Sequence, residues 1–420
     1  DGNAIEASAS SVTASTCSIS ANGQSAVRAV LRSRIALLGT TVTGHPGDAI
    51  DIHASAVDLQ DCEIKENNAR AVIADQGTLT VAGTLIADQQ GVGLSLVDSR
   101  ADITSSQIRD NGGAGVEAVT STVSLGDSTL SGHPTDGIKL DRASLELEGS
   151  LVSNNNGSAV VALDSQATIS DSTISDNDRH GLDLTNSSAV VMNGSQITQN
   201  GDIAIRTDNA TVTVVRSSVT DHPTTGIYLD NSPASVSEST ISGHAGWGIE
   251  AVDHTALMAS KAIITGNTLG GISLTSSVAA LLGAEVKANS SSGVLLAQRS
   301  ALMAIEAIVS DNAAVGISLD TSSASVRLST VSGNREHGMK LVGQSVLSLY
   351  NSTISGNAQD GLHFEDSLGS LRGSEILNNV GFGIYADALS LLAGYDNSLS
   401  GNGTDRSETV PVELTLPRPQ

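Results

Sequence analysis

A repeat that runs along the whole chain constrains the fold more than any other feature. It is clearest at 172–177 and again at 352–357, where Ser-Thr-Ile-Ser is followed two residues later by Asn. We call the Asn position of each copy the ladder position. A fixed period of this length predicts a stack of similar structural units, each in contact with its neighbours. Eighteen ladder positions follow one another at steps of 22 or 23 residues: Asn22, His45, Asn67, Gln89, Asn111, His133, Asn155, Asn177, Asn200, His222, His244, Asn267, Asn289, Asn312, Asn334, Asn357, Asn379 and Asn402.

Two columns of aliphatic residues accompany the ladder positions and predict short strands. One column lies three residues before each ladder position and holds Ile, Val or Leu in every copy, as at Ile174, Ile264 and Ile354. The second lies five residues after it and usually follows glycine, as Leu182 follows Gly181. Apolar and polar residues alternate around both columns, which is the period of a strand, and no segment sustains a helical period. We therefore expect an almost purely β chain in which these aliphatic residues are buried.

Short strands at this period predict a parallel β-helix, in which each coil pairs with the coils on either side at a spacing of ~4.8 Å. Such a core is narrow, and this explains how a chain with 39% hydrophobic but only 2% aromatic residues can fill it. We expect the ladder amides to bond to one another from coil to coil and to tolerate a left-handed corner. We expect the glycine four residues after each ladder position to lie at the next corner with positive φ.

These residues resemble the right-handed parallel β-helix repeat proteins of the pectate-lyase-like superfamily, and the resemblance covers nearly the whole chain. It implies an all-β fold, a single-stranded right-handed parallel β-helix, for which the repeat predicts about 18 coils of 22–23 residues. The right hand also agrees with the crossover rule for parallel strands. We assign residues 1–403 to this repeat domain and residues 404–420, which leave the register, to a C-terminal cap or tail. Because Ile5 already lies in the second aliphatic column, we expect the chain to begin within a coil, as a fragment of a longer protein with further domains.

The charge balance argues against several classes of partner. Forty-five acidic residues against 21 Lys and Arg give a formal charge of -24. Nucleic-acid backbones and anionic membrane surfaces are bound by clustered Lys and Arg, which such a chain lacks. No apolar run approaches the ~18 residues that a membrane span needs. Acidity and the absence of Lys-rich patches favour a secreted or cell-surface protein.

The two cysteines are expected to be free thiols. Cys17 and Cys62 both lie five residues before a ladder position, in a column that is otherwise mostly Ser or Thr. A whole coil carrying Thr40 separates them, so their Cα atoms should lie roughly 9 to 10 Å apart. A disulfide tolerates about 7 Å at most. We expect both to fill space as small buried residues.

The superfamily contains polysaccharide lyases, epimerases and hydrolases, so their motifs are the first candidates for chemistry. The Asn-Thr-Asp, Asp-Asp, Gly-His-Gly and Arg-Ile-Lys signatures of polygalacturonases are absent, and so is the Asp-Pro-His-Asp box of mannuronan epimerases. The nearest match to that box, Asp178-Arg179-His180-Gly181, lacks the proline and the spacing. No catalytic residue can be assigned, because a fold alone does not determine a function.

The best candidate for a binding surface is the outward face of the strand that contains the second aliphatic column. Four of the seven aromatic residues fall on its outward positions. Two interpretations stay open. Opposite charges one coil apart, such as Asp183 and Arg206, could form ion pairs worth about a few tenths of a kcal/mol each. Alternatively, the face could bind an extended glycan, with rings as stacking platforms and carboxylates as hydrogen-bond acceptors. The candidate ligand-binding residues form a first patch, Asp183, Arg206, Asp208, Tyr228, Asp230, Trp247 and Glu250, and a second patch, His337, Lys340, Asp360, His363, Glu365 and Tyr385.

Metal binding is an open question at this stage. Asp183, Asp208 and Asp230 on consecutive coils could supply the oxygen ligands that Ca²⁺ prefers, or they could be ordinary surface acids. The histidines at the ladder positions, His45, His133, His222 and His244, are expected to be turn residues and not metal ligands.

Two functions from different classes fit these observations. The first is a rigid extracellular scaffold that presents an elongated face to a carbohydrate or to another surface protein. The second is a polysaccharide lyase or C5-epimerase that acts on a polyuronate, assisted by calcium. Such an enzyme needs a base near the sugar C5 proton and a positive centre on the carboxylate. Arg206 with Tyr228, or Lys340 with His363, are the pairs that could provide both on neighbouring coils.

Overall fold

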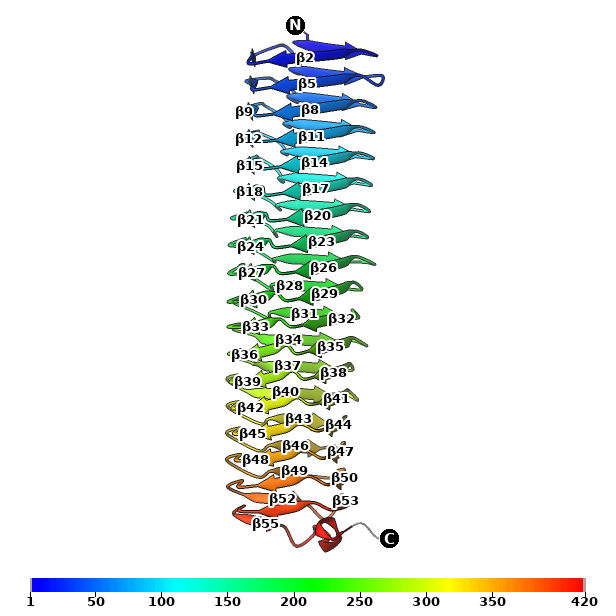
Figure 1. Ribbon diagram of the computed structural model, residues 1–420, viewed down its shortest axis with the longest axis vertical. Coiled ribbons are helices and arrows are strands. Elements are labelled where there is room, and N and C mark those ends of the chain that lie inside the picture. Colours follow the sequence, from blue (N-terminus) through cyan, green and yellow to red (C-terminus); the bar gives the residue numbers. More distant parts are fainter. Residues whose placement is uncertain (1, 418–420) are drawn as a thin grey trace. The chain divides into compact units, whose positions relative to one another are not determined.

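The computed structural model describes residues 2–417 and divides the chain into two compact units, Asp1–Thr211 and Val212–Gln420. Each unit is a parallel β-solenoid in which every coil contributes one strand to each of three sheets, A, B and C (Figure 1). The predicted fold, an all-β parallel β-helix of about 18 coils over the described residues, is confirmed.

In the first unit, each coil runs through the three sheets in the order A, B, C. Its sheet A strands are β1 (Ile5–Ser8), β4 (Val27–Val30), β7 (Ile50–His53), β10 (Val72–Asp75), β13 (Leu94–Val97), β16 (Val116–Val119), β19 (Ile138–Asp141), β22 (Val160–Leu163), β25 (Leu182–Thr185) and β28 (Ile205–Asp208). Its sheet B strands are β2 (Ser11–Ser15), β5 (Arg34–Leu38), β8 (Ala56–Gln60), β11 (Thr78–Ala82), β14 (Arg100–Thr104), β17 (Thr122–Gly126), β20 (Ser144–Glu148), β23 (Gln166–Ser170) and β26 (Ala189–Asn193). Its sheet C strands are β3 (Ser18–Ser20), β6 (Thr41–Thr43), β9 (Glu63–Lys65), β12 (Leu85–Ala87), β15 (Gln107–Arg109), β18 (Thr129–Ser131), β21 (Leu151–Ser153), β24 (Thr173–Ser175) and β27 (Gln196–Thr198).

The second unit repeats the same coil and closes with a 3₁₀ helix. Its sheet A strands are β31 (Ile227–Asp230), β34 (Trp247–Val252), β37 (Gly270–Thr275), β40 (Ser292–Ala297), β43 (Ile317–Asp320), β46 (Met339–Val342), β49 (Leu362–Phe364), β52 (Phe382–Ala386) and β55 (Thr404–Arg406). Its sheet B strands are β29 (Thr211–Val215), β32 (Ala234–Ser237), β35 (Ala256–Ser260), β38 (Val278–Leu282), β41 (Ala301–Ile305), β44 (Ser323–Arg327), β47 (Val346–Tyr350), β50 (Leu368–Arg372) and β53 (Leu391–Tyr395). Its sheet C strands are β30 (Ser218–Thr220), β33 (Thr240–Ser242), β36 (Ile263–Thr265), β39 (Glu285–Lys287), β42 (Ile308–Ser310), β45 (Thr330–Ser332), β48 (Thr353–Ser355), β51 (Glu375–Leu377) and β54 (Ser398–Ser400).

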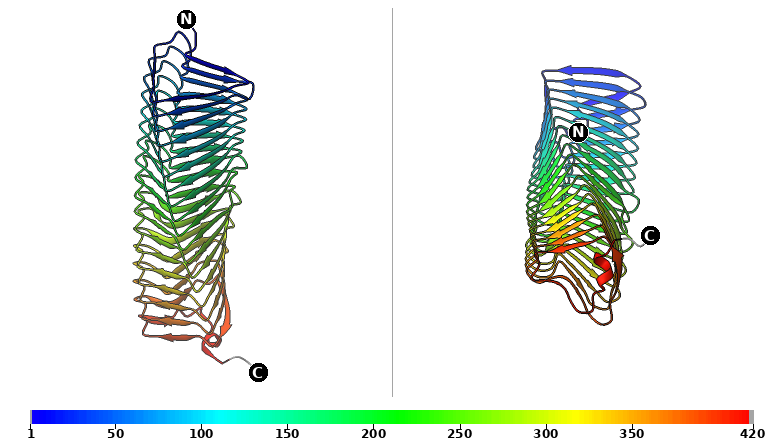
Figure 2. Two further views of the ribbon diagram at one scale, coloured as in Figure 1. Left: turned by 45° about the horizontal axis from the view of Figure 1, so that its top comes forward. Right: turned by 60° about the horizontal axis from the view of Figure 1, so that its bottom comes forward.

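The core consists of the inward-facing residues of the three sheets. Ile174, Ile264 and Ile354 are fully buried, as their column predicts. In the second unit, β55 continues sheet A to Arg406, and η1 (Val412–Thr415) follows it near the C-terminus (Figure 2). This 3₁₀ helix lies against β53, and its Leu414 is buried. The Nδ2 of Asn397 donates to the Leu414 carbonyl at 2.8 Å, so this segment also bonds to the last corner of the solenoid.

The ladder amides bond from coil to coil as predicted. In the first unit, Nδ2 of Asn155 donates to Oδ1 of Asn177 at 2.7 Å. In the second, Asn312 donates to Asn334 from both its backbone N–H, at 3.1 Å, and its Nδ2, at 3.0 Å. These groups are buried, where an unpaired amide costs about 1–3 kcal/mol. The side chains of Asn155, Asn177, Asn312 and Asn334 are therefore hydrogen-bonded although they lie in an otherwise apolar interior.

The glycine four residues after the ladder position was expected to be needed for a positive φ, and this explanation is wrong. Gly316, an example from the second unit, is not at positive φ. A Cβ there would lie 2.7 Å from Nδ2 of the ladder residue Asn334 and 2.6 Å from the carbonyl oxygen of Gly338. Glycine is therefore needed for close packing against the next coil. The left-handed residue is instead the one just before the ladder position, as at Asp176 (φ 55°) and Gly333 (φ 66°).

The cysteines are free, as predicted, but only one of them is buried. Cys62 lies in the interior, where burial raises the pKa of its thiol above the ordinary value. Cys17 is exposed, which contradicts the expectation that both are buried. A solenoid residue is covered by the coils on both sides, and among the described residues Cys17 has a neighbouring coil on one side, the coil that carries Thr40.

Candidate functional site

The residues of the first patch fall in both compact units, and each part is described by itself. In the first unit, Arg206 on β28 donates to Asp183 on β25 at 2.7 Å, which is the ion pair of the simpler interpretation. Asp208 lies opposite Thr185 and not opposite Asp183. With one oxygen of Asp183 bound to Arg206 and Asp208 two residues further along, the structure gives no support to a calcium site at these two acids.

The second-unit part of the first patch lies on β31 and β34. Tyr228 lies opposite Glu250, and Asp230 lies opposite Val252. The ring of Trp247 lies against Gly270 on the next coil, at a position where a Cβ would overlap it. Tyr228, Trp247 and Glu250 are all partly exposed, so they can be reached from solvent.

The second patch, by contrast, forms a connected cluster on three successive coils of the second unit. His337 and Asp360 lie in the turns before β46 and β49, and His363 and Lys340 lie on those strands. The pairing of the strands sets Lys340 opposite His363 and His363 opposite Tyr385. The ladder period therefore brings residues that are 22 or 23 positions apart in sequence into direct contact.

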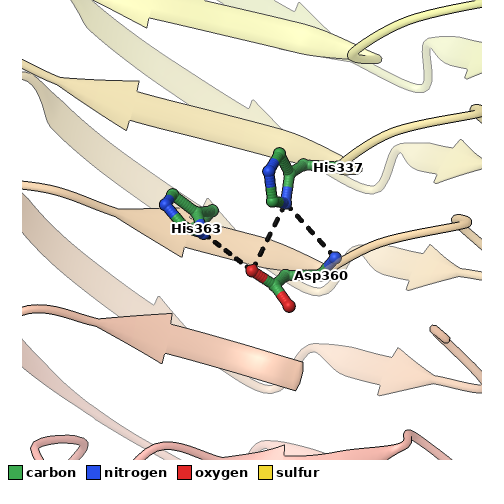
Figure 3. A group of neighbouring side chains, drawn as sticks. All are labelled: His337, Asp360 and His363. Carbon is green, nitrogen blue, oxygen red and sulfur yellow. Dashed lines mark hydrogen bonds and ion pairs between the residues drawn. The ribbon is translucent and has the colours of Figure 1, made fainter. Parts of the chain in front are cut away.

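Asp360 is at the centre of this cluster (Figure 3). One carboxylate oxygen, Oδ1, accepts the backbone N–H of Phe382 at 2.7 Å. The other, Oδ2, lies 2.7 Å from Nδ1 of His363 and 3.3 Å from Nδ1 of His337. Burial alone would raise the pKa of Asp360, but the contacts with the two imidazoles outweigh it and hold the pKa well below its usual range. Asp360 is therefore a buried carboxylate that stays ionised.

His363 lies between two carboxylates. Its Nδ1 contacts Asp360, and its Nε2 lies 2.8 Å from Oε1 of Glu365. Burial lowers the pKa of His363, and the two hydrogen bonds to carboxylates raise it by more, so that the pKa lies above its ordinary value. Lys340 is 3.9 Å from the same Glu365 oxygen. Its partly exposed ammonium group balances the acids of the cluster.

A stack of rings extends from this cluster along sheet A. The His337 and His363 rings have centroids 4.4 Å apart, and the Tyr385 ring stacks on His363 at 4.5 Å with an angle of 15°. Phe382 lies beside Tyr385 at 5.7 Å. Tyr385 and Phe382 then line a surface depression of about 580 Å³, whose other side chains include Asp387, Arg406, Glu408 and Thr409. Sequence reasoning missed this depression, because it treated residues 404–420 as a tail outside the binding face.

A second surface feature of the second unit was also missed. The outward residues of β35, β38, β41, β44 and β47 in sheet B form an apolar groove of about 550 Å³. Met258, Val278, Met303 and Val346 on this groove are 42–50% exposed. The signal in the sequence is that aliphatic residues and Met replace Ser and Thr at outward positions of these strands. No titratable side chain lines the groove, so it offers a contact surface but no acid–base chemistry.

The histidines at ladder positions are buried. His45 is fully buried and bonds within the ladder, with Nε2 3.0 Å from Asn22 and Nδ1 2.9 Å from Asn67. Within residues 2–417, a single group of three His, Cys, Asp or Glu side chains has donor atoms close enough to share a metal ion. That group is His337, Asp360 and His363, and it contains neither a ladder histidine nor an acid of the first patch.

Comparison with protein families identifies the fold family. The sequence model of the family described as "right handed beta helix region" matches residues 3–144, 119–269 and 258–407 of this chain. The chain belongs to the right-handed β-helix family. This β-helix protein has no significant match among curated protein sequences. Across the described residues it has no helix of the length and apolarity that crossing a membrane requires.

Three solved structures illustrate the likeness of this β-helix protein to others. The mannuronan C-5 epimerase A-module of Azotobacter vinelandii is 12% identical with a TM-score of 0.37, covering 75% of this chain and 88% of its own. A periplasmic alginate epimerase is 12% identical with a TM-score of 0.34, and the match covers 89% of this chain and 78% of the epimerase. A pectate lyase is 12% identical with a TM-score of 0.26, and the match covers 57% of this chain and 60% of the lyase. These likenesses concern the fold alone.

Proposed function

We propose that this β-helix protein is a carbohydrate-binding scaffold whose main binding site is the second patch together with the adjoining depression. The observation that carries the proposal is the pair of half-buried rings, Tyr385 and Phe382, that line a hollow large enough for a sugar ring. Ligand sites combine an apolar floor with a few polar groups that fix orientation. Asp387 and Glu408 at the same depression could accept hydrogen bonds from sugar hydroxyls.

The proposal extends to a chain of sugars and not only to one residue. From the depression, the outward face of sheet A continues through Tyr385 and His363 to Lys340 on successive coils. Coils follow one another at ~4.8 Å, so a ligand lying along the stack meets a new side chain at each coil. Tyr228, Trp247 and Glu250, on earlier coils of the second unit, are proposed as a further contact region on the same face. Secretion or surface exposure, where such glycans occur, is part of the proposal.

The test is a binding titration of Tyr385→Ala. Loss of the stacking ring should weaken binding of an oligosaccharide about tenfold, which corresponds to about 1.4 kcal/mol. Calorimetry against a panel of neutral and uronate oligosaccharides, with calcium and with EDTA, would measure it, and the thermal midpoint should change little because the ring is half-exposed.

The matched control is Tyr350→Ala, which removes an exposed tyrosine from sheet B of the same unit. It should leave binding unchanged. Equal loss of affinity in both variants would contradict the site, and absence of binding to every glycan in the panel would contradict the function.

A second candidate function is supported by one observation, the direct pairing of Lys340 with His363. A lyase or C5-epimerase needs a base close to a positive group, and these two side chains lie on adjacent strands at the proposed binding face. Incubation with polyuronates separates the two functions. A rise in absorbance from unsaturated uronates would show a lyase, and uptake of solvent deuterium at C5 without cleavage would show an epimerase. Binding of the polyuronate without either change would support the scaffold function.

A further inference from the structure

The cluster of His337, Asp360 and His363 has the composition of a transition-metal site. One donor atom from each of the three residues lies within 4.8 Å of the other two, and both imidazoles are directed at the Asp360 carboxylate (Figure 3). Their side chains are 12–14% exposed, so the donors are shielded but can still be reached. We propose that these three residues bind a divalent transition metal ion of the zinc type.

The contacts of His337 point to a cation. Its Nδ1 is 3.2 Å from the backbone nitrogen of Asp360, whose N–H must donate to it, and 3.3 Å from Oδ2 of the same residue, which can only accept. One imidazole nitrogen cannot accept from the first and donate to the second. Nδ1 has a single lone pair, so to bind a metal ion it must give up the bond from the Asp360 N–H, and that lone pair and an Oδ2 lone pair would then meet on the ion. Two ligands on one tetrahedral ion with bonds of about 2.0 Å lie about 3.3 Å apart, which matches this separation.

The contacts of His363 point the same way. Histidines that bind metals usually donate their other ring N–H to a carboxylate, which fixes the orientation of the ring. Glu365 provides that partner at Nε2 of His363, at 2.8 Å, and so leaves Nδ1 directed at Asp360. A metal ion would replace the proton now shared between Nδ1 and Oδ2, which are 2.7 Å apart, and that proton would pass to solvent.

The structural role of Asp360 does not explain the histidines. Asp136 in the first unit also lies three residues after a ladder position, and its Oδ1 accepts the backbone N–H of Ser158 at 2.9 Å, just as Oδ1 of Asp360 accepts that of Phe382. A coil therefore needs one oxygen of this aspartate. The second oxygen of Asp360 remains for the two imidazoles.

The donor set selects the class of metal. Two imidazole nitrogens and one carboxylate oxygen suit zinc and its neighbours, whereas Ca²⁺ and Mg²⁺ take oxygen ligands. Three protein ligands leave a coordination position for water or for an oxygen atom of a bound molecule. The inference goes beyond the proposed carbohydrate binding, since it requires neither Tyr385 nor the depression.

The experiment is a titration of the chelator-treated protein with Zn²⁺ by calorimetry and with Co²⁺ by visible absorption. We expect one ion per chain, a tetrahedral Co²⁺ spectrum, and no competition from millimolar Ca²⁺. His363→Ala and Asp360→Asn should each weaken binding at least tenfold. The Asn variant can still accept the Phe382 N–H, so loss of the fold would not account for its effect.

Two control variants complete the experiment. His53→Ala removes an exposed histidine that also contacts an aspartate, Asp75 at 3.0 Å, but belongs to no group of three such donors within residues 2–417, and it should leave metal binding unchanged. Phe382→Ala keeps the backbone N–H that Asp360 accepts and removes a ring of the depression whose ring contact is with Tyr385, so it should also bind the metal normally, which separates this inference from the glycan site. Wild-type protein that binds no Zn²⁺, or binds it as tightly after His363→Ala and Asp360→Asn as before, would overturn the proposal.

Discussion

At the scale of single residues, close packing between coils decides where a side chain can be accommodated. The glycine before the second aliphatic column lies directly over the ladder amide and the carbonyl of the next coil, as Gly316 does over Asn334 and Gly338. Gly356 is a different case, because it has φ 64° and no neighbour within 4 Å of an added Cβ. The same residue type thus serves two purposes, space in one position and backbone conformation in the other.

This difference predicts different costs for two substitutions. Gly316→Ala should lower the free energy of unfolding by about 2–3 kcal/mol or more, because the added methyl group forces two coils apart. Gly356→Asn should cost about 1 kcal/mol or less, because Asn tolerates the left-handed region and the site has room. Urea denaturation of both variants measures the two costs. Equal costs would mean that close packing is not the reason for Gly316.

At the scale of the structural element, the two neighbouring ladder histidines, His222 and His244, are buried in the ladder in their neutral form. In His244, Nδ1 accepts the backbone N–H of His222 at 3.3 Å, and Nε2 is 3.1 Å from the carbonyl oxygen of Val219. Both ring nitrogens are therefore used. Burial lowers the pKa of His222 to about 3, helped by repulsion from His244, and burial lowers the pKa of His244 to about 4, which the Val219 carbonyl and Asp221 partly oppose.

These pKa values predict acid sensitivity of the second unit. Since both lie below the ordinary 6.5, the fold stabilises neutral imidazole. That stability is fully present above about pH 6.5 and is lost as the pH falls towards 4 and 3, by up to about 1.4 kcal/mol per pH unit for each group. Replacing both by Asn, the usual ladder residue, should flatten urea-unfolding midpoints measured between pH 7 and pH 4. An unchanged slope in that double variant would place the acid sensitivity elsewhere.

At the scale of the whole molecule, the repeat predicted the fold because each residue of a column meets the equivalent residue one coil away. The aliphatic columns, the Asn ladder and the free cysteines followed from that rule. The site followed only in part. The period predicts that Lys340, His363 and Tyr385 are neighbours, but Asp360 and His337 lie in turns, where the direction of a side chain depends on backbone angles that the sequence pattern does not reveal. The depression beside Tyr385 depends on how residues 404–409 leave the register.

The same rule predicts which deletions the chain tolerates. Removal of residues 312–333 takes out one complete coil of the second unit and joins Asp311 to Asn334, so every column stays in register. We expect a folded protein with the same β-sheet circular dichroism and a cooperative transition at slightly lower urea concentration. Removal of residues 312–322, half a coil, should instead abolish cooperative unfolding, because inward and outward residues no longer align. Equal tolerance of both deletions would contradict this role of the register.

The polar ladders also have a direction. The backbone N–H of most ladder residues donates to the side chain of the following coil, as Asn289 does to Asn312 and Asn357 to Asn379. Each coil is thus completed by residues that leave the ribosome after it. A solenoid of this kind can be assembled during translation, because every new coil supplies the hydrogen-bond acceptors for the coil made just before it.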